Sequence, residues 1–187
     1  MADAISATKP EDKPLPSIPA QTRIGHVHLK VADLDRAVRF YRDIMGFDLL
    51  FNFGTAAFLS AGGYHHHIGL NPWESKDGQP PAPGTTGLYH YAINYPERRD
   101  LAAALVRILD SGWGIDGASD HGTHEAIYMH DPDFNGMELA WDRRPEEWPR
   151  KDGALTFDRK PLDFPGLLGE LEDPTHAHYL EYLSQYT

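Results

Sequence analysis

The chain contains an internal repeat, and this repeat limits its fold more than any other feature. IGHVHLKV, residues 24–31, alternates apolar and polar side chains, and a segment with apolar residues at helical spacing follows it and ends at Gly46. LYHYAINY, residues 88–95, begins a second copy of this order, whose helical segment ends at Gly112. Alternation predicts a half-buried strand, and spacings of three and four predict an amphipathic helix. Three short strand candidates follow each helix, so each half is predicted to be a βαβββ module.

The repeat places the chain in the α+β class and divides it into five segments. Two modules related by a pseudo-twofold axis are expected to form an open-sided β-barrel around a central site. The tail contains an amphipathic stretch, DFPGLLGELEDPTHAHYLEYL, which leaves three roles open: docking on its own barrel, covering a pocket or joining a partner. The predicted segments are an extended N-terminal arm at residues 1–22, the first module at 23–75, a linker at 76–87, the second module at 88–144 and a helical C-terminal tail at 145–187.

Composition narrows the partners that the chain is expected to bind. The 28 acidic and 17 basic residues give a formal charge of −11, and no Lys/Arg cluster is present that could neutralise phosphates, so nucleic acid is not expected as a partner. The chain has no cysteine, so any metal must be held by histidine and carboxylate. No apolar run approaches the roughly 18 residues that span a bilayer, and the N-terminus lacks the apolar core of a secretory signal. We therefore expect a cytoplasmic protein without a membrane partner.

The repeat predicts a cluster of histidine and glutamate that no linear motif shows. His26 and His90 occupy matched positions in the first strand of each half. Pairing the last strands of the two halves makes Glu138 the counterpart of His67, which alternation places on the polar face together with His65. Two histidines and one carboxylate on rigid strands suit Fe(II) or a similar divalent ion and leave coordination positions open, so the barrel would surround a metal site. The alternative is that these are hydrogen-bonded histidines of the barrel interior and a carboxylate at its edge.

Four stretches resemble one known family. They are IGHVHLKVADLDRAVRFYRDIMGF, YHHHIGLNPW, GLYHYAINYPERRDL and DHGTHEAIYMHDPDFNGMELAWDR, which together cover residues 24 to about 148. They resemble the vicinal oxygen chelate superfamily, which includes glyoxalases, bleomycin resistance proteins and extradiol dioxygenases, and most of all its catechol 2,3-dioxygenase-like branch. The last stretch keeps the family order of DHG, Tyr, DP, a turn and Glu, although Phe134-Asn135-Gly136 replaces the usual turn. The arm and the tail after Trp148 are not covered.

The resemblance implies an iron-dependent oxygenase. His26, His90 and Glu138 match the two histidines and one glutamate that bind Fe(II) in extradiol dioxygenases, and Mn(II) accepts the same three donors. The implied substrates are a catechol-type aromatic diol and O2, and the implied product is a ring opened next to the diol. Because both modules lie in one chain, no dimer is needed to complete the site, and a homo-oligomer remains open.

The resemblance also assigns roles to residues beside the metal. His67 resembles the histidine that exchanges protons with the substrate, and histidine is suited to this near neutral pH. Tyr128 matches a tyrosine that hydrogen-bonds the bound substrate, and His121 matches a histidine of the DHG motif beside the site. The role of the other histidines is less constrained: we leave open His28, His65 and His124, and we expect surface or structural positions for His66, His130, His176 and His178.

Two other functions occur within the same superfamily. A glyoxalase-like isomerase or lyase usually has Glu as a fourth ligand and catalytic base, whereas this chain has His67 there; such a site would favour Zn(II) or Ni(II). A metal-free binding protein of the bleomycin-resistance type would hold an apolar or cationic ligand between the modules, and it would not need the histidine and glutamate triad.

Overall fold

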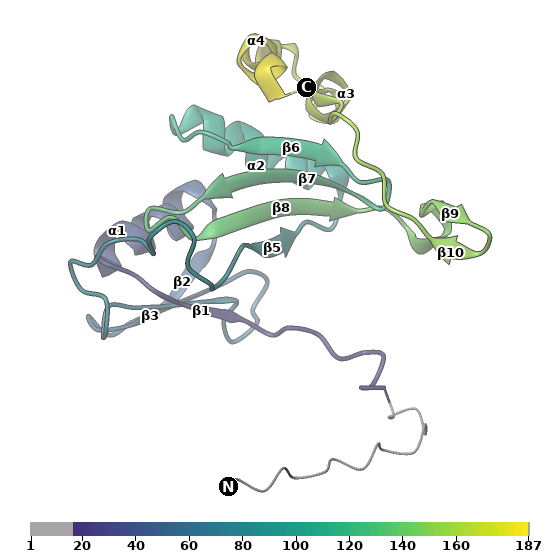
Figure 1. The fold of residues 1–187 in the computed structure, drawn as a ribbon. Coiled ribbons are helices and arrows are strands. Elements are labelled where there is room, and N and C mark those ends of the chain that lie inside the picture. The colour runs from purple at the N-terminus through teal and green to yellow at the C-terminus, as the bar shows by residue number, and fades with distance from the viewer. Residues whose placement is uncertain (1–16, 187) are drawn as a thin grey trace, which may run out of the picture.

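The computed structural model describes residues 17–186, so most of the arm predicted for residues 1–22 lies outside the described residues. Two four-stranded sheets, one from each half of the chain, lie next to each other with helices against them (Figure 1). The predicted α+β class and the two βαβββ modules are confirmed. The sheets do not close into a complete barrel, which agrees with the open-sided arrangement expected from the sequence.

The first module follows the predicted order of elements. The Asp33 carboxylate accepts a hydrogen bond from the Arg36 amide at 3.0 Å and begins the first helix. Gly46 has a φ of 85°, a value that favours glycine, and ends the helical segment. The sheet has the order β1-β4-β3-β2, with β1 and β4 parallel. Its elements are β1 (Val27–Lys30), α1 (Leu34–Arg39), the π-helix η1 (Phe40–Ile44), β2 (Asp48–Asn52), β3 (Ala57–Ser60) and β4 (Ile68–Asn71).

The second module repeats this architecture. Its sheet has the order β5-β8-β7-β6, and β5 and β8 are parallel, as β1 and β4 are in the first sheet. Leu101, Leu105 and Ile108, which the helical spacing predicts to face inward, are all fully buried. The elements are β5 (Tyr91–Asn94), α2 (Arg98–Asp110), β6 (Gly117–Asp120), β7 (His124–His130) and β8 (Gly136–Asp142).

The strand register corrects one expectation from the repeat. In each module, the residue after the histidine of the first strand pairs with a buried apolar residue of the last strand. These pairs are Val27 with Ile68, and Tyr91 with Met137. His67 directly precedes its apolar partner, whereas Glu138 directly follows its own, so the two residues are not equivalent. The counterpart of His67 is Gly136, and the counterpart of Glu138 is Gly69.

The three consecutive histidines also lie outside the strand in which alternation placed them. β4 begins at Ile68, and residues 65–67 form the irregular segment that leads into it. The alternation of side chains between two faces holds only within a regular strand. The prediction that His65 and His67 share a strand face was therefore wrong, because neither residue lies in a strand. Their positions are defined by their individual contacts.

A buried polar network joins the two modules. The Tyr41 hydroxyl lies 2.6 Å from the Tyr91 hydroxyl and donates a hydrogen bond to the Asp131 carboxylate at 2.8 Å. Nearby, Asp133 accepts a hydrogen bond from the Arg36 side chain at 2.6 Å. Burial raises the pKa of Tyr41 and Tyr91, so both hydroxyls keep their protons and can donate. Since Tyr91 directly follows His90 in the chain, this network fixes the start of β5 against the first module.

The tail docks on its own chain, which is the first of the roles left open by the sequence. Phe164 and Leu167 are buried, and the Arg98 side chain of α2 donates to the Gly166 carbonyl at 2.9 Å. No helix within residues 17–186 is long and apolar enough to cross a membrane. The tail elements are η2 (Pro145–Glu147), β9 (Arg150–Lys151), β10 (Ala154–Leu155), α3 (Phe164–Gly169), η3 (Pro174–His178), α4 (Tyr179–Leu183) and η4 (Ser184–Tyr186).

Candidate active site

His90 and Glu138, two of the three predicted metal ligands, are in direct contact. His90 precedes β5 and Glu138 lies on the adjacent strand β8, where it is opposite Ala92. The carboxylate oxygen Oε2 of Glu138 lies 2.9 Å from His90 Nε2, and the Glu138 side chain is only 9% exposed. Gly136 allows this approach, because a Cβ at that position would overlap the carbonyl oxygen of Tyr89.

The second oxygen of Glu138 contacts a histidine whose role the sequence left open. His124 begins β7, and its Nε2 lies 3.1 Å from Glu138 Oε1. His124 and Tyr128 are four residues apart on this strand, so they face the same side of the sheet. The alternation in HEAIYMH places His124 on the same face as Tyr128, which pairs with Glu138, but it does not by itself predict the contact with Glu138.

Tyr128 and His121, both predicted as site residues, form the next pair along the same face. The Tyr128 hydroxyl lies 2.8 Å from His121 Nε2, while His121 Nδ1 lies 3.2 Å from the backbone carbonyl oxygen of Asp158. Burial and, to a lesser extent, the Glu138 carboxylate raise the pKa of Tyr128 to about 12, although the charge of Arg159 acts to lower it. Tyr128 is therefore neutral in the neutral pH range and able to donate a hydrogen bond.

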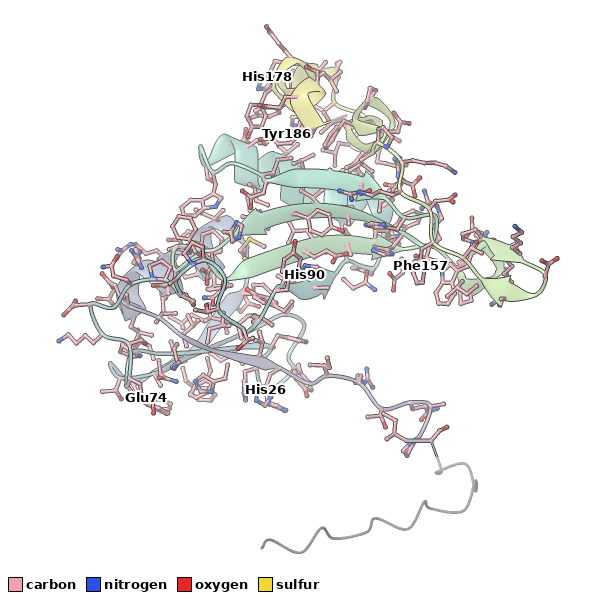
Figure 2. All side chains as sticks on the ribbon, viewed as in Figure 1. His26, Glu74, His90, Phe157, His178 and Tyr186 are labelled. Atoms are coloured by element: carbon pink, nitrogen blue, oxygen red, sulfur yellow. The ribbon has the colours of Figure 1, made fainter. Side chains whose placement is uncertain are left out.

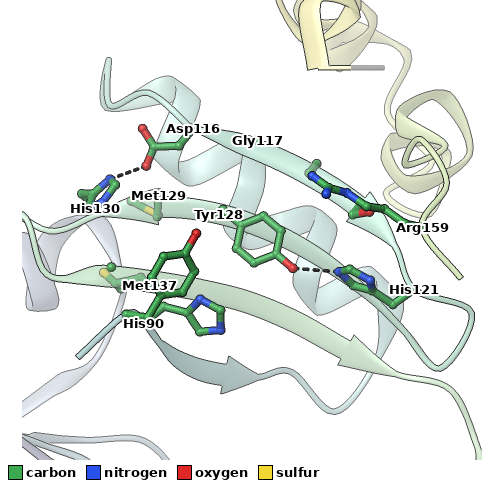
Figure 3. Close-up of a pocket in the computed structure, with 13 residues that line it drawn as sticks. His90, Asp116, Gly117, His121, Tyr128, Met129, His130, Met137 and Arg159 are labelled. Atoms are coloured by element: carbon green, nitrogen blue, oxygen red, sulfur yellow. Dashed lines mark hydrogen bonds and ion pairs between the residues drawn. The ribbon is translucent and has the colours of Figure 1, made fainter. Parts of the chain in front are cut away.

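His90, His121 and Tyr128 line a cavity of about 490 Å³ in the second module (Figure 3). The close-up shows His90, Tyr128 and His121 on one face of the second sheet, with Arg159 from the tail at the same side. Asp116 and His130 form an ion pair at another edge of the cavity. A cavity of this size suits a small ligand such as a single substituted aromatic ring.

His26, the third predicted ligand, lies on the other sheet. Figure 2 shows His26 beside β1 and His90 on the neighbouring module. Both line a second cavity of about 660 Å³ between the modules, but the nearest ring to His26 is His66, at 4.3 Å between centroids. Within residues 17–186, no three histidine or acidic side chains are placed so that they could hold one metal ion together. The chemistry of the three donors suits Fe(II) or Mn(II), and the structure brings two of them, His90 and Glu138, into direct contact.

His67 lines the cavity between the modules and has a fixed ring. Its Nδ1 accepts a hydrogen bond from the Ala61 amide at 3.2 Å and lies 3.1 Å from the Ser60 hydroxyl. The Ala61 amide thus occupies Nδ1 and leaves Nε2 as the ring nitrogen that a ligand could contact. His67 shares the cavity with His26 and His90.

The other histidines have structural or surface contacts. His28 lies 2.8 Å from the Asn71 side-chain nitrogen and packs edge-on against Phe58, and burial lowers its pKa, with a further decrease from His26. His65 and His66 contact each other through their Nδ1 atoms at 2.8 Å. Burial lowers the pKa of His66, and the nearby imidazoles of His26 and His65 lower it further. The remaining two, His176 and His178, lie in the tail at η3.

Comparison with known proteins identifies the family. The sequence model of the Glyoxalase/Bleomycin resistance protein/Dioxygenase superfamily matches residues 23–139. The chain belongs to this superfamily. The match includes both modules and the residues His26, His67, His90 and Glu138, and it ends before the tail.

Two curated members of the superfamily are similar to this chain. Catechol-2,3-dioxygenase of Bacillus subtilis (strain 168) is 41% identical over 158 residues, which are 84% of this chain and 55% of that protein. Biphenyl-2,3-diol 1,2-dioxygenase 3 of Rhodococcus globerulus is 28% identical over 127 residues, 67% of each chain. This chain therefore spans about half the length of the first relative and two thirds of the second.

Solved structures support the fold of this superfamily member. The crystal structure of a glyoxalase/dioxygenase from Nostoc punctiforme aligns with a TM-score of 0.55 and 21% identity, covering 70% of this chain and 99% of the other. At this level of identity the likeness concerns the fold alone. The paired βαβββ arrangement of this chain is thus the arrangement of its superfamily.

Proposed function

We propose that the chain is an extradiol dioxygenase that cleaves the ring of a catechol-type substrate with O2. The observation that carries the proposal is the contact between His90 and Glu138, which brings two donors of the expected triad onto neighbouring strands. The names of the two curated relatives, which are dioxygenases of catechol and of a biphenyl diol, support this reaction over an isomerisation. The neutral Tyr128 hydroxyl supplies a hydrogen-bond donor at the same cavity.

In this proposal His26, His90 and Glu138 hold Fe(II), and Mn(II) could occupy the same donors. When bound, the ion would hold the catechol and O2 beside each other and mediate electron flow between them. His90 and Glu138 are already within 2.9 Å, whereas His26 contacts His66 on the other module. The proposal therefore requires His26 to turn from His66 toward the cavity that it shares with His90 when the metal binds.

The remaining residues of the site would position the substrate and move its protons. Tyr128, held by His121, would donate a hydrogen bond to a catechol oxygen, because its raised pKa keeps it protonated. His67 would contact the substrate through Nε2 and exchange a proton with it there, since Nδ1 is occupied by the Ala61 amide.

The function can be tested by anaerobic metal analysis followed by addition of catechol and then air, with the visible spectrum recorded throughout. Bound iron and a new yellow product whose absorbance changes with pH would establish extradiol cleavage. Stoichiometric zinc or nickel without product would contradict the proposal and favour a glyoxalase-like isomerase or lyase. A protein that binds no metal even after reconstitution with Fe(II) would instead be a metal-free binding protein.

Replacing His67 is expected to separate proton transfer from metal binding. We predict that His67→Gln retains its iron but loses about 10²- to 10⁴-fold in kcat, the usual contribution of a general acid or base. Metal content and steady-state turnover of the same preparation provide the measurement. His66→Gln is the matched control, because His66 is adjacent in sequence and contacts His26 but does not line the cavity between the modules. A larger loss of turnover in His66→Gln would transfer the role to His66, and loss of iron in His67→Gln would make His67 a ligand.

A further inference from the structure

Arg159 is the cation of the tail that lines the cavity of the second module. It borders this cavity together with His90, His121 and Tyr128, and its charge lowers the pKa of Tyr128 (Figure 3). Arg159 lies beyond residues 23–139, the part of the chain that the superfamily model matches. The tail therefore adds to the cavity a charged group that the repeated modules do not supply.

The backbone on both sides of Arg159 is fixed to the edge of the sheet. Lys160 exchanges two hydrogen bonds with Asp120 of β6, at 2.8 and 2.9 Å. The Asp158 amide donates to the His121 carbonyl at 3.0 Å, and the Asp158 carbonyl is close to His121 Nδ1. Arg159 thus lies between two anchored residues and beside His121, the residue that contacts Tyr128. The backbone at Arg159 is therefore held at the edge of the cavity by strand-like pairing, while its side chain is exposed.

The acidic groups that border the cavity or flank Arg159 already have other partners. Asp158 binds Lys160 at 2.7 Å, and Asp120 binds Arg143 at 2.8 Å. On the other side of the cavity, Asp116 binds His130. Within residues 17–186, Arg159 itself forms no ion pair or hydrogen bond.

An arginine without a partner at a cavity is suited to one class of ligand group. The guanidinium is planar, stays charged at every pH at which proteins are normally folded, and can donate two parallel hydrogen bonds to a carboxylate. The chain has a formal charge of −11, so a negatively charged ligand is not attracted by the protein as a whole and needs a local cation to bind.

We propose that the substrate is a catechol with a carboxylate substituent, and that Arg159 binds this carboxylate. This inference rests on the proposed ring-cleaving function and specifies its substrate class. The diol would lie toward His90 and Tyr128, and the carboxylate would point toward the tail, because these residues and Arg159 border the same cavity. Arg159 is then a specificity residue, since it contacts the substituent and not the ring oxygens.

The test compares two substrates that differ in charge but hardly in shape, 3,4-dihydroxybenzoate and 3,4-dihydroxybenzamide. We expect the wild-type protein to prefer the acid by about 10-fold in kcat/KM. This factor corresponds to the weaker end of the range for hydrogen bonds to charged groups, because Arg159 is exposed to solvent. Arg159→Gln should reduce this acid-to-amide ratio to about one, and Arg159→Lys should keep part of it. Lys151→Gln is the control, because it removes the same charge from an exposed tail residue that does not border the cavity.

Binding without turnover makes the two proposals separable. Anaerobic calorimetric titration with 3,4-dihydroxybenzoate should give a Kd about 10-fold weaker for Arg159→Gln than for the wild type and for Lys151→Gln. Equal cleavage of acid and amide by the wild type, or a Kd that does not depend on Arg159, would overturn the inference while leaving ring cleavage intact. Arg159-dependent binding of the acid without cleavage of either compound would support the carboxylate site and contradict the proposed function.

Discussion

Glu138→Gln is expected to abolish ring cleavage and to lower iron affinity by more than about 100-fold. Replacing a residue that only orients a metal ligand costs up to about 100-fold in metal affinity, and loss of a ligand itself should cost more. Glu138 supplies the negative charge of the proposed triad and contacts His90 with one oxygen and His124 with the other. The amide has nearly the same shape as the carboxylate but removes the charge and places an N–H donor toward one of these imidazoles. Iron content after anaerobic reconstitution and turnover of catechol provide the measurement.

A matched control distinguishes a metal ligand from a merely acidic residue. Glu146→Gln removes one negative charge from the exposed helix η2, where the side chain borders neither cavity. We expect it to keep wild-type iron content and turnover. If Glu138→Gln also bound iron as tightly as the wild type, Glu138 would be excluded as a ligand, and the His90–Glu138 contact would be structural.

The same measurement on two histidine variants decides which histidine is the third donor. The resemblance to the superfamily assigns this role to His26, but in the structure His124 is the residue that contacts the second oxygen of Glu138. We expect His26→Gln to lose iron as Glu138→Gln does, and His124→Gln to retain most of it. The opposite result would place the metal entirely within the second module, on His90, His124 and Glu138.

The fold was predictable because its signals are local. Alternating residues predicted strands β1 and β5, and apolar spacing predicted the helices that follow. Gly46 and Gly112 ended the two helical segments at positive φ, as expected for glycine after a helix. These patterns depend on residues within a few positions of one another, so they are visible without knowledge of the tertiary structure.

The candidate site was predictable only in part because it depends on register and on contacts between distant segments. The repeat placed Glu138 opposite His67, two positions from its actual counterpart Gly69, and because side chains alternate with a period of two, a shift of two residues leaves the pattern unchanged. The pairing of Tyr91 with Met137 resolved this register. The contact of His124 with Glu138 follows from the pairing of β7 with β8, and the placement of Arg159 follows from the attachment of the tail to β6, neither of which a local pattern encodes.

A buried charge network that the sequence did not reveal carries the second large prediction. Glu125 lies on β7 next to His124 but faces away from the cavity, and its side chain is 5% exposed. Its two oxygens bind Arg98 of α2 at 2.8 Å and Arg143 after β8 at 3.1 Å. Arg98 also binds Glu170 of the tail at 3.0 Å. The network therefore joins the sheet, the helix that covers it and the tail that positions Arg159.

Glu125→Ala is expected to lower the free energy of unfolding by about 3 kcal/mol, the lower end for a broken buried ion pair, because Arg98 and Arg143 lose their shared carboxylate but keep Glu170 and Asp120. This is a large part of the roughly 5–15 kcal/mol that stabilises a typical domain. Urea unfolding followed by circular dichroism measures this loss, provided that the slope of the unfolding free energy against urea concentration is the same for the variant and the wild type.

Two further variants show whether the loss comes from unpaired charge. In Glu125→Ala combined with Arg98→Met, one of the two guanidinium groups that lost Glu125 is removed, so part of the stability should return if the lost charge pairing is the cause. Glu147→Gln breaks the ion pair between Glu147 and Arg144, two exposed residues of the tail, and should leave the unfolding midpoint unchanged. A Glu125→Ala midpoint equal to that of the wild type would contradict the network. A lower midpoint that Arg98→Met does not raise would assign the loss to packing around β7 and not to charge.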